Sequence, residues 1–421
     1  MSNVNTSVMN GVVQGYCAPQ FERVMDAFIE NLNTRGEIGA SVCITFEGET
    51  VVDLWGGLAR RPKEGKPGTP WEQDTVCVVF SSTKGATALC AHMLASRGIL
   101  DLDAPVAEYW PEYAVNGKED TRVSMMLDHT AGSPAHRTPV KKGGTADFDY
   151  MADLLAQEEP HWAPGSRQGY HGLTYAWTIG SVIRRAAGKS LQAFFADEVA
   201  GPLGLDFRIG IPEADYPATE KRLAPIVPAS LDPNRPKSKF QEAIEKDNQS
   251  IPALFLLNTG GMTFNDPALH KAEVGSANGM TNGRGLAHMY APLALGGSQN
   301  GVTLVDAATL SRMGRVSAAT QDDATLRMPT RFALGFMKSM DNRKLDKAYS
   351  VESAILSDAA FGHVGAGGSI GFADPAAGMS FGYTMNKQGL GLLLNDRGQA
   401  LVDAAYQCIG YRSDVAGVWE R

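Results

Sequence analysis

Strand-like patterns occur near both ends of this chain, and helical patterns fill the region between them. Seven runs have the apolar, β-branched character of strands: 39–46, 50–58, 75–80, 332–337, 360–364, 369–374 and 379–385. Eight runs have the spacing of helices: 20–33, 83–96, 123–127, 148–157, 173–187, 191–199, 283–295 and 398–409. The order predicts an α/β (α+β) fold, in which an antiparallel sheet built from both chain ends is flanked by helices and a helical domain is inserted.

The same order predicts two domains. Residues 1–100 and 300–421 would form the α/β domain, and residues 101–299 a mainly helical domain. Residues 209–251 differ in character, since they are rich in Pro, Lys, Glu and Asp. A segment this long and polar is expected to be a surface excursion or a lid over a site.

Composition narrows the partners and the compartment. Of 421 residues, 43% are hydrophobic, which is enough for a large core, and the net charge of -8 without a basic cluster argues against nucleic acid or an anionic membrane surface. The first fourteen residues have no apolar signal-like run, and no 18-residue apolar stretch occurs. Five scattered cysteines show neither zinc nor disulfide spacing. We therefore expect a reduced, cytoplasmic protein.

The tetrapeptide Ser81-Ser82-Thr83-Lys84 joins the strand expected over 75–80 to the helix expected over 83–96. Ser81 and Lys84 are three apart, which puts both on one face of the first helical turn. A serine hydroxyl becomes a nucleophile when a neighbour takes its proton, and the helix start offers free N–H groups to an oxyanion. Ser-x-x-Lys also occurs about once by chance in a chain this long, and Ser and Thr are ordinary helix caps, so the tetrapeptide alone leaves a structural role open.

Tyr170 is the candidate proton shuttle for Ser81. It follows Pro164-Gly165-Ser166 and precedes the helix expected from Leu173, where a phenol could point into a cleft. Its ordinary pKa is about 10, so a neighbouring ammonium such as that of Lys84 would have to lower it. The alternative is a tyrosine that anchors the loop by its hydroxyl. Tyr175 is the weaker candidate because it falls inside the helical pattern.

The segment Phe361–Gly368 is dense in glycine and contains His363 at a strand end. Glycine there allows close backbone approach to a ligand, and an N–H group of this segment could be the second oxyanion donor. The alternative is a strand-end histidine without a role. Gly367–Gly371 matches Gly-x-Ser-x-Gly, but a strand and a hairpin turn follow instead of a helix, so Ser369 is not expected to be a nucleophile.

Metal and cofactor chemistry is not expected. The remaining histidines show no metal-ligand spacing: His92, His129, His136, His161, His171, His270 and His288.

Taken together, these elements resemble the serine β-lactamase and penicillin-binding-protein superfamily, in its class-C-like branch of family VIII carboxylesterases. Ser81–Lys84 resembles the Ser-x-x-Lys box. Tyr170-His171-Gly172 resembles the Tyr-x-Asn box with its third residue changed, and His363-Val364-Gly365 resembles the Lys-Thr-Gly box with lysine changed to histidine. The stretches 127–132 and 276–279 are also typical of the group, and the resemblance covers about residues 20 to 410.

The resemblance implies a cleft between the two lobes and an acyl-enzyme. Ser81 would attack the acyl carbon, Lys84 and Tyr170 would move its proton, and the N–H groups of Ser81 and Ala366 would hold the oxyanion, with His363 and Gly365 beside the substrate. The histidine at 363 removes a permanent cation that could hold a substrate carboxylate. The glycine at 172 removes a side-chain amide. Both changes favour simple esters over β-lactams.

The expected function is therefore a serine carboxylesterase acting on short-chain, small-molecule esters. The alternatives are a β-lactamase or D-amino-acid peptidase, an acyltransferase on the same site, and a non-catalytic binding protein that keeps the fold. The natural substrate, the stereochemical preference and the oligomeric state are not encoded in any motif of the sequence.

Overall fold

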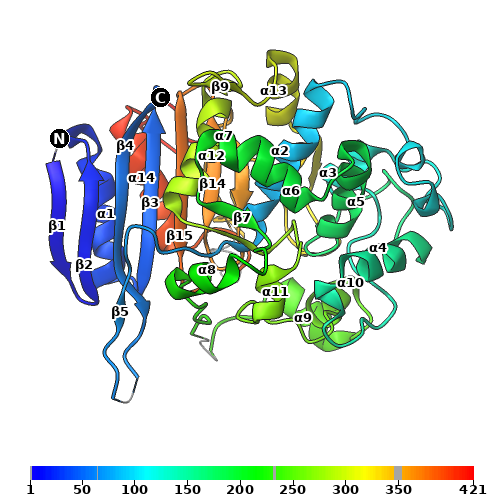
Figure 1. The fold of residues 1–421 in the computed structure, drawn as a ribbon, viewed down its shortest axis with the longest axis horizontal. Coiled ribbons are helices and arrows are strands. Elements are labelled where there is room, and N and C mark those ends of the chain that lie inside the picture. Colours follow the sequence, from blue (N-terminus) through cyan, green and yellow to red (C-terminus); the bar gives the residue numbers. More distant parts are fainter. Residues whose placement is uncertain (1, 64, 231–233, 346–352) are drawn as a thin grey trace.

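A broad sheet forms one side of the molecule (Figure 1), and the computed structural model describes residues 2–63, 65–230, 234–345 and 353–421. Within these residues the main sheet has eight strands in the order β1-β2-β4-β3-β15-β14-β13, with β5 paired to β4 beside this path, and all pairs are antiparallel. The strand bounds are Ser2–Val8 (β1), Gly11–Cys17 (β2), Gly39–Phe46 (β3), Glu49–Arg60 (β4), Thr69–Pro70 (β5), Phe361–Val364 (β13), Ile370–Asp374 (β14) and Met379–Met385 (β15). The prediction of an antiparallel sheet from both chain ends is confirmed.

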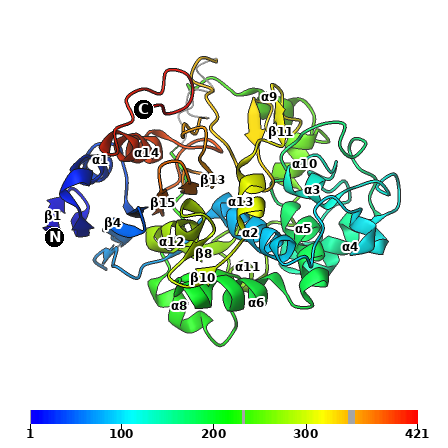
Figure 2. The same ribbon diagram turned by 90° about the horizontal axis from the view of Figure 1, so that it is seen from above.

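Helices cover both faces of this sheet (Figure 2). Helix α1 (Glu22–Asn33) and helix α14 (Asp396–Cys408) lie together on one face, and α12 (Gly283–Ala294) packs on the other against β3, β14 and β15. Helix α1 buries Val24, Phe28 and Leu32, a stripe four residues apart that matches its predicted amphipathic spacing. Helix α12 precedes residue 300 in the sequence and yet packs on the sheet. The domain boundary expected at 299/300 stays a prediction.

The remaining helices lie on the other side of the molecule, around α2 (Figure 1). Helix α2 (Thr83–Ser96) is buried from Thr83 to Leu94, since small residues let neighbours approach it from every side. The others are α3 (Val123–Leu127), α4 (Phe148–Gln157), α5 (Tyr175–Ala187), α6 (Leu191–Phe195), α7 (Gly201–Leu203), α8 (Tyr216–Arg222), α9 (Lys239–Lys246), α10 (Ile251–Leu257), α11 (Pro267–Lys271) and α13 (Ala307–Gly314). Short 3-10 turns are η1 (Pro19–Phe21), η2 (Phe80–Ser82), η3 (Val106–Glu108), η4 (Pro111–Tyr113) and η5 (Gly144–Ala146), and η6 (Ala196–Ala200) is a π-helix.

Three small sheets also lie within the described residues. The one that matters for function has the order β6-β8-β7, because β6 leads directly into Ser81. Its strands are Cys77–Val78 (β6), Phe207–Ile209 (β7) and Gly279–Thr281 (β8). The other pairs are Ser298–Gln299 (β9) with Val302–Thr303 (β10), and Ala318–Thr320 (β11) with Thr330–Phe332 (β12).

Two expected strands differ from the structure, and one hairpin was not expected. Residues 2–17 form the β1–β2 hairpin, which the polar sequence did not reveal. The strand expected over 332–337 is wrong: Gly335 has a φ of +85°, and the chain turns so that Phe332 pairs with Met337. The strand expected over 75–80 contracts to β6, because Phe80 has a left-handed φ of +48°.

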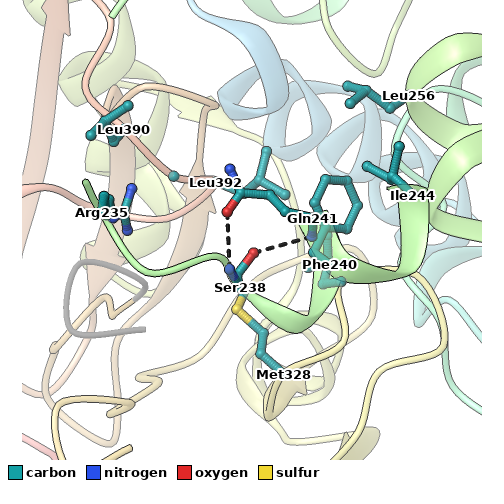
Figure 3. Close-up of a pocket in the computed structure, with 11 residues that line it drawn as sticks. Arg235, Ser238, Phe240, Gln241, Ile244, Leu256, Met328, Leu390 and Leu392 are labelled. Carbon is teal, nitrogen blue, oxygen red and sulfur yellow. Dashed lines mark hydrogen bonds between the residues drawn. The ribbon is translucent and has the colours of Figure 1, made fainter. Parts of the chain in front are cut away.

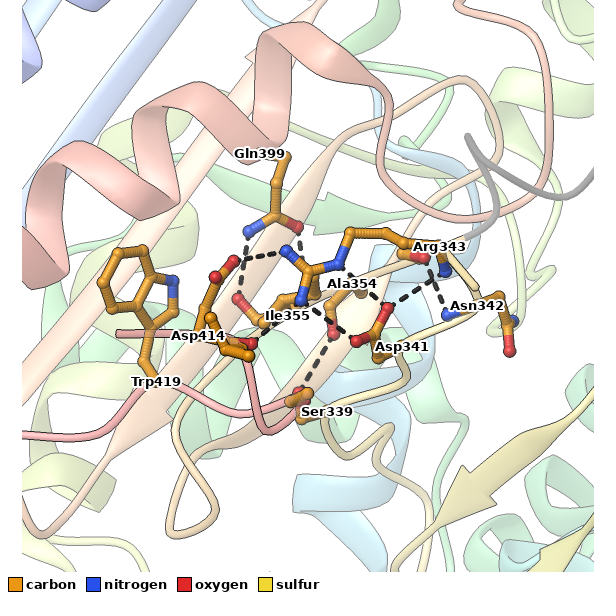
Figure 4. A network of polar contacts seen from close by, with 12 residues as sticks. Ser339, Asp341, Asn342, Arg343, Ala354, Ile355, Gln399, Asp414 and Trp419 are labelled. Atoms are coloured by element: carbon orange, nitrogen blue, oxygen red, sulfur yellow. Dashed lines mark hydrogen bonds and ion pairs between the residues drawn. The ribbon is translucent and has the colours of Figure 1, made fainter. Parts of the chain in front are cut away.

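A polar network attaches the C-terminal residues to the body of the protein (Figure 4). The Arg343 guanidinium donates to Asp341 at 2.9 Å and to Asp414 at 2.6 Å. The side-chain amide of Gln399, on α14, exchanges two hydrogen bonds with the backbone of Ile355 at 2.9 and 3.0 Å. The first contacts join Asp341 and Arg343 to Asp414 near the C-terminus, and the second pair joins Ile355 to α14.

All five cysteines are free thiols. In the described ranges, no helix has both the length and the apolar character needed to cross a bilayer.

Candidate active site

Ser81 lies at the junction where β6 turns into α2. Its neighbour Phe80 has a φ of +48°, a backbone conformation that non-glycine residues adopt only when surrounding contacts impose it. The Thr83 hydroxyl imposes it here, since it donates to the Phe80 carbonyl at 2.6 Å and accepts from the Gly279 N–H at 2.8 Å. Ser82, Thr83 and Lys84 are buried, whereas Ser81 keeps partial exposure. Of the four, only Ser81 is therefore open to a substrate.

Lys84 is completely buried and faces three oxygens. Its Nζ lies 3.0 Å from Ser81 Oγ, 2.6 Å from the Gly172 carbonyl and 2.9 Å from the Ser276 carbonyl. No carboxylate in the described chain forms an ion pair with it, and burial holds the pKa of Lys84 well below its usual range. A neutral amine would give its two N–H groups to the carbonyls and keep its lone pair toward the Ser81 hydroxyl.

Tyr170 lies against this pair, on the loop before α5. Its ring is buried beside Phe332 and His129, with centroid separations of 5.8 and 4.9 Å, and Lys84 Nζ lies 4.8 Å from its centroid. Burial raises the pKa of Tyr170 above its ordinary value, and a hydrogen bond to the Ser81 side chain offsets part of that rise. The expectation that Lys84 lowers this pKa is wrong, because desolvation is the larger effect. The phenol is protonated at neutral pH.

Sequence reasoning missed the groups that fix Tyr170. The buried Asp323 carboxylate accepts hydrogen bonds from the Tyr170 N–H at 3.0 and 3.1 Å, and also from the N–H groups of Thr325 and Leu326. His129 Nδ1 accepts from the N–H of His171 at 3.2 Å. Asp323 lies in no recognisable sequence motif, whereas His129 lies in the stretch 127–132, which is typical of the resembled group.

His171 serves the loop and not the substrate. Its Nδ1–H donates to the Gly169 carbonyl at 2.7 Å, and its Nε2 accepts from the Ser133 N–H at 2.9 Å. Burial lowers the pKa of His171 to about 3, so the ring stays neutral.

The glycine-rich segment forms the turn between β13 and β14, opposite Ser81. A Cβ on Gly365 would meet the Val79 carbonyl at 2.1 Å, so only glycine fits. The N–H groups of Ser81 and Ala366 donate to no group within the described chain, which leaves both available to an oxyanion. The Asn395 side chain donates to the Gly367 carbonyl at 2.7 Å and fixes the segment from behind.

His363 is buried and neutral at the edge of the site. Its Nδ1–H donates to the Val364 carbonyl at 2.8 Å, which makes Nε2 an acceptor, and Nε2 is buried without a partner in the described chain. Its ring centroid lies 6.1 Å from that of Tyr170. Burial first, and then the charge that Lys84 can carry, hold the pKa of His363 well below its usual range. A neutral ring at this position agrees with the expectation that it offers no fixed cation, and the effect on substrate choice stays a prediction.

The ring of Phe255 fills the space where a side chain at position 172 would lie. A Cβ on Gly172 would come within 1.9 Å of the Phe255 ring, and that ring lies 6.5 Å from Tyr170. Phe255 belongs to α10, far along the chain from Gly172, so no local pattern could indicate this contact. An aromatic face thus replaces the amide that the resembled box would present.

The two rejected candidates are structural. Ser369 is buried, and its hydroxyl donates to the Val79 carbonyl at 2.8 Å and lies 3.1 Å from Ser82 Oγ. Tyr175 lies inside α5 with its hydroxyl buried and unpartnered in the described chain. No three His, Cys, Asp or Glu side chains of the described residues could together hold a metal ion. The structure thus brings Ser81, Lys84, Tyr170, His363 and the turn carrying Gly365 and Ala366 together, while their chemical roles stay predictions.

Comparison with known proteins supports one family. The beta-lactamase family model matches residues 22–405. The chain is 31% identical to the esterase/beta-lactamase LipL of Mycobacterium tuberculosis (strain ATCC 25618 / H37Rv) over 386 residues, which cover 91% of this chain and 85% of LipL.

Two solved structures agree with this result. A family VIII carboxylesterase has 35% identity and a TM-score of 0.81, and the match covers 94% of this chain and 99% of that one. A penicillin-binding protein homologue from Caulobacter crescentus has 31% identity and a TM-score of 0.80, again over 94% of this chain and 99% of the other.

Proposed function

The chain belongs to the beta-lactamase family and is a serine hydrolase, and we propose that it is a carboxylesterase that cleaves short-chain esters through an acyl-enzyme on Ser81. The observation that carries this proposal is the arrangement at Lys84 Nζ, where two carbonyls and Ser81 Oγ lie within 3.0 Å and no carboxylate among the described residues is paired with it. A buried amine without a paired carboxylate favours its neutral form, and this one faces the proposed nucleophile.

In the acylation step, the Ser81 oxygen bonds to the ester carbon while Lys84 takes its proton. The carbonyl oxygen becomes an oxyanion and accepts from the N–H groups of Ser81 and Ala366. Removing one such donor in serine hydrolases costs about 10²–10³ in rate. The start of α2 adds the positive end of its dipole.

Collapse of this intermediate breaks the bond to the alcohol. The alkoxide takes the proton of the Tyr170 hydroxyl, and the phenol regains one from the Lys84 ammonium, so both groups return to their resting state. Water then attacks the acyl-enzyme by the reverse route and Ser81 leaves with its proton. A phenol with a raised pKa suits this role of donor better than that of base.

His363 directs the choice of substrate. A neutral imidazole cannot compensate a buried substrate carboxylate, and an unpaired charge in such a site is costly. We therefore propose that neutral esters are better substrates than β-lactams. β-Lactam hydrolysis is the second candidate, because the name of LipL joins the two activities. We further propose a cytoplasmic location with reduced cysteines and small-molecule esters as the partners.

The test is to trap the acyl-enzyme. Incubation with p-nitrophenyl butyrate, acid quench and peptide mass spectrometry should place a butyryl group on Ser81 in the wild type and in Ser369→Ala. An adduct on Ser369, or none anywhere, contradicts the proposal. The second candidate is tested by kcat/KM for a chromogenic cephalosporin, which should fall far below that for p-nitrophenyl butyrate; an equal or higher value would show that His363 does not exclude β-lactams.

A further inference from the structure

A cavity of about 220 Å³ lies between the α9–α10 pair and two loops of the body (Figure 3). Phe240, Ile244 and Leu256 approach it from the two helices, and Leu390 and Leu392 lie across from them. Helix α9 is fixed at its start by a capping box, in which Ser238 and Gln241 exchange side-chain to backbone hydrogen bonds. The predicted excursion 209–251 thus supplies part of a wall, although its residues 231–233 lie outside the described residues.

One lining residue is linked to the loop that carries Tyr170, the proposed proton donor. Leu326, which lines the cavity, donates its N–H to the same Asp323 carboxylate that holds the Tyr170 N–H. Leu326 and Met328 also belong to the same buried apolar cluster as Tyr170. The loop that fixes the proposed proton donor is therefore the loop that lines the cavity.

A second lining residue is linked to the turn that carries Ala366, the proposed oxyanion donor. Gly391, another lining residue, accepts at its carbonyl from the Gly367 N–H at 3.3 Å, and Gly367 follows Ala366. Two aromatic contacts link the cavity to Tyr170 on a third side. The ring centroids of Phe240 and Phe255 lie 6.1 Å apart, and those of Phe255 and Tyr170 lie 6.5 Å apart.

We infer that this cavity binds a short, unbranched hydrocarbon chain of the ester and that Phe240 sets the length it accepts. The inference rests on the proposed esterase function and names its substrate class. The volume lies below the roughly 300–1,000 Å³ of sites for drug-sized ligands, so the cavity suits a short chain and not a bulky acyl-amido group. Leu256 is 48% exposed, and a bound chain would cover this apolar surface.

The chain has two possible sources, the acid or the alcohol of the ester. Two substrate series separate them: p-nitrophenyl esters from acetate to decanoate, and acetate esters from ethyl to octyl. In one series kcat/KM should rise about fourfold per methylene while the cavity fills, and then fall. Phe240→Ala should move that maximum to longer chains and Phe240→Trp to shorter ones. Glu242→Gln, an exposed change on the same helix, should leave the profile unchanged.

Thermal unfolding of every variant shows whether α9 has collapsed. A folded Phe240→Leu should shift the chain-length maximum less than Phe240→Ala does. If neither series responds to any folded Phe240 variant, the inference is wrong even though the ester is cleaved.

Occupancy without turnover is measured by calorimetric titration of Ser81→Ala with 1-hexanol. The added change Phe240→Trp should weaken binding at least tenfold, and equal binding would overturn the inference. If 1-hexanol binds in this Phe240-dependent way but the wild type cleaves no ester, the cavity stands and the proposed function fails.

Discussion

The two walls of the site differ in how deeply they bury their side chains. The wall formed by η2, α2 and the β13–β14 turn buries Lys84 and His363 almost completely and fixes them with hydrogen bonds to backbone carbonyls. The wall formed by α9 and α10 leaves Leu256 and Leu257 48% and 61% exposed. Proton transfer requires atoms held to within a fraction of an ångström, whereas recognition of an alkyl chain requires only apolar surface of the right extent. We therefore propose that the first wall carries the bond-breaking chemistry, and that the second wall acts together with His363 in selecting the substrate.

Ser81→Ala, which removes the proposed nucleophile of the first wall, should have the largest effect on activity. Loss of a nucleophile from a unit that acts together lowers kcat by about 10⁴–10⁶-fold. Ester hydrolysis measured with p-nitrophenyl butyrate, together with thermal unfolding, checks that activity is lost and the fold kept. Ser369→Ala is the matched control: it removes a buried hydrogen bond, so it should lower stability by about 1–3 kcal/mol and keep activity. An active Ser81→Ala would refute the assignment of the first wall.

Lys84→Arg should be nearly as damaging, because a guanidinium stays protonated and cannot take the serine proton. In the wild type the lowered pKa of Lys84 favours the neutral amine, so kcat/KM should rise with pH and reach its plateau well below 10.5. The pH dependence of kcat/KM from pH 5 to 10 measures this. Activity that keeps rising toward pH 10.5 would mean that burial does not tune this lysine.

Tyr170→Phe should lower kcat by about 10²–10⁴-fold, since it removes the proposed proton donor and leaves the ring packing in place. Tyr175→Phe is the control, because the centroid of its ring lies 5.7 Å from Lys84 Nζ while its buried hydroxyl has no partner in the described chain. Steady-state kinetics of the two variants decide the matter. Similar turnover in both would return Tyr170 to the role of a loop anchor.

The sequence predicted α2 and two central strands of the main sheet, because short-range residue patterns determine these elements. The helix expected over 83–96 matches α2, the strands over 39–46 and 379–385 match β3 and β15, and Ser81 and Lys84 share a helical face as their spacing requires. The left-handed Phe80 escaped notice, since its conformation depends on Thr83 and on Gly279, which is distant in the sequence.

Contacts between segments that are distant in the sequence could not be predicted in this way. Phe255 reaches Gly172 across more than eighty residues, and Asp323 reaches Tyr170 across about 150, so no local pattern records either contact. The direction of the Tyr170 pKa was also beyond reach, because it depends on how deeply the ring is buried. Non-local packing, and not propensity, was the missing information.

A smaller change tests the point where the two walls meet. Gly172→Ala should destabilise the fold by about 1–3 kcal/mol through overpacking against the Phe255 ring. Phe255→Ala should remove this penalty, so denaturant unfolding of the double variant should show a coupling of about 1 kcal/mol or more. Gly314→Ala, whose new Cβ would lie 3.3 Å from its nearest neighbour, is the control. Additive effects would show that the walls do not touch here.

The smallest effect is expected for His363→Gln, which keeps a neutral hydrogen-bonding group in place of the imidazole. Because the pKa of His363 is held well below 6.5, the ring is already neutral from pH 6 to 8, so kcat/KM for p-nitrophenyl butyrate should fall less than about tenfold, and its pH profile in that range should keep its shape. The comparison is made between wild type and variant across this range. An inflection near pH 6.5 that disappears in His363→Gln would show that the histidine titrates during turnover. His363 would then be positively charged at acidic pH. The first wall could in that case pair this cation with an anionic substrate, which the neutral ring cannot do.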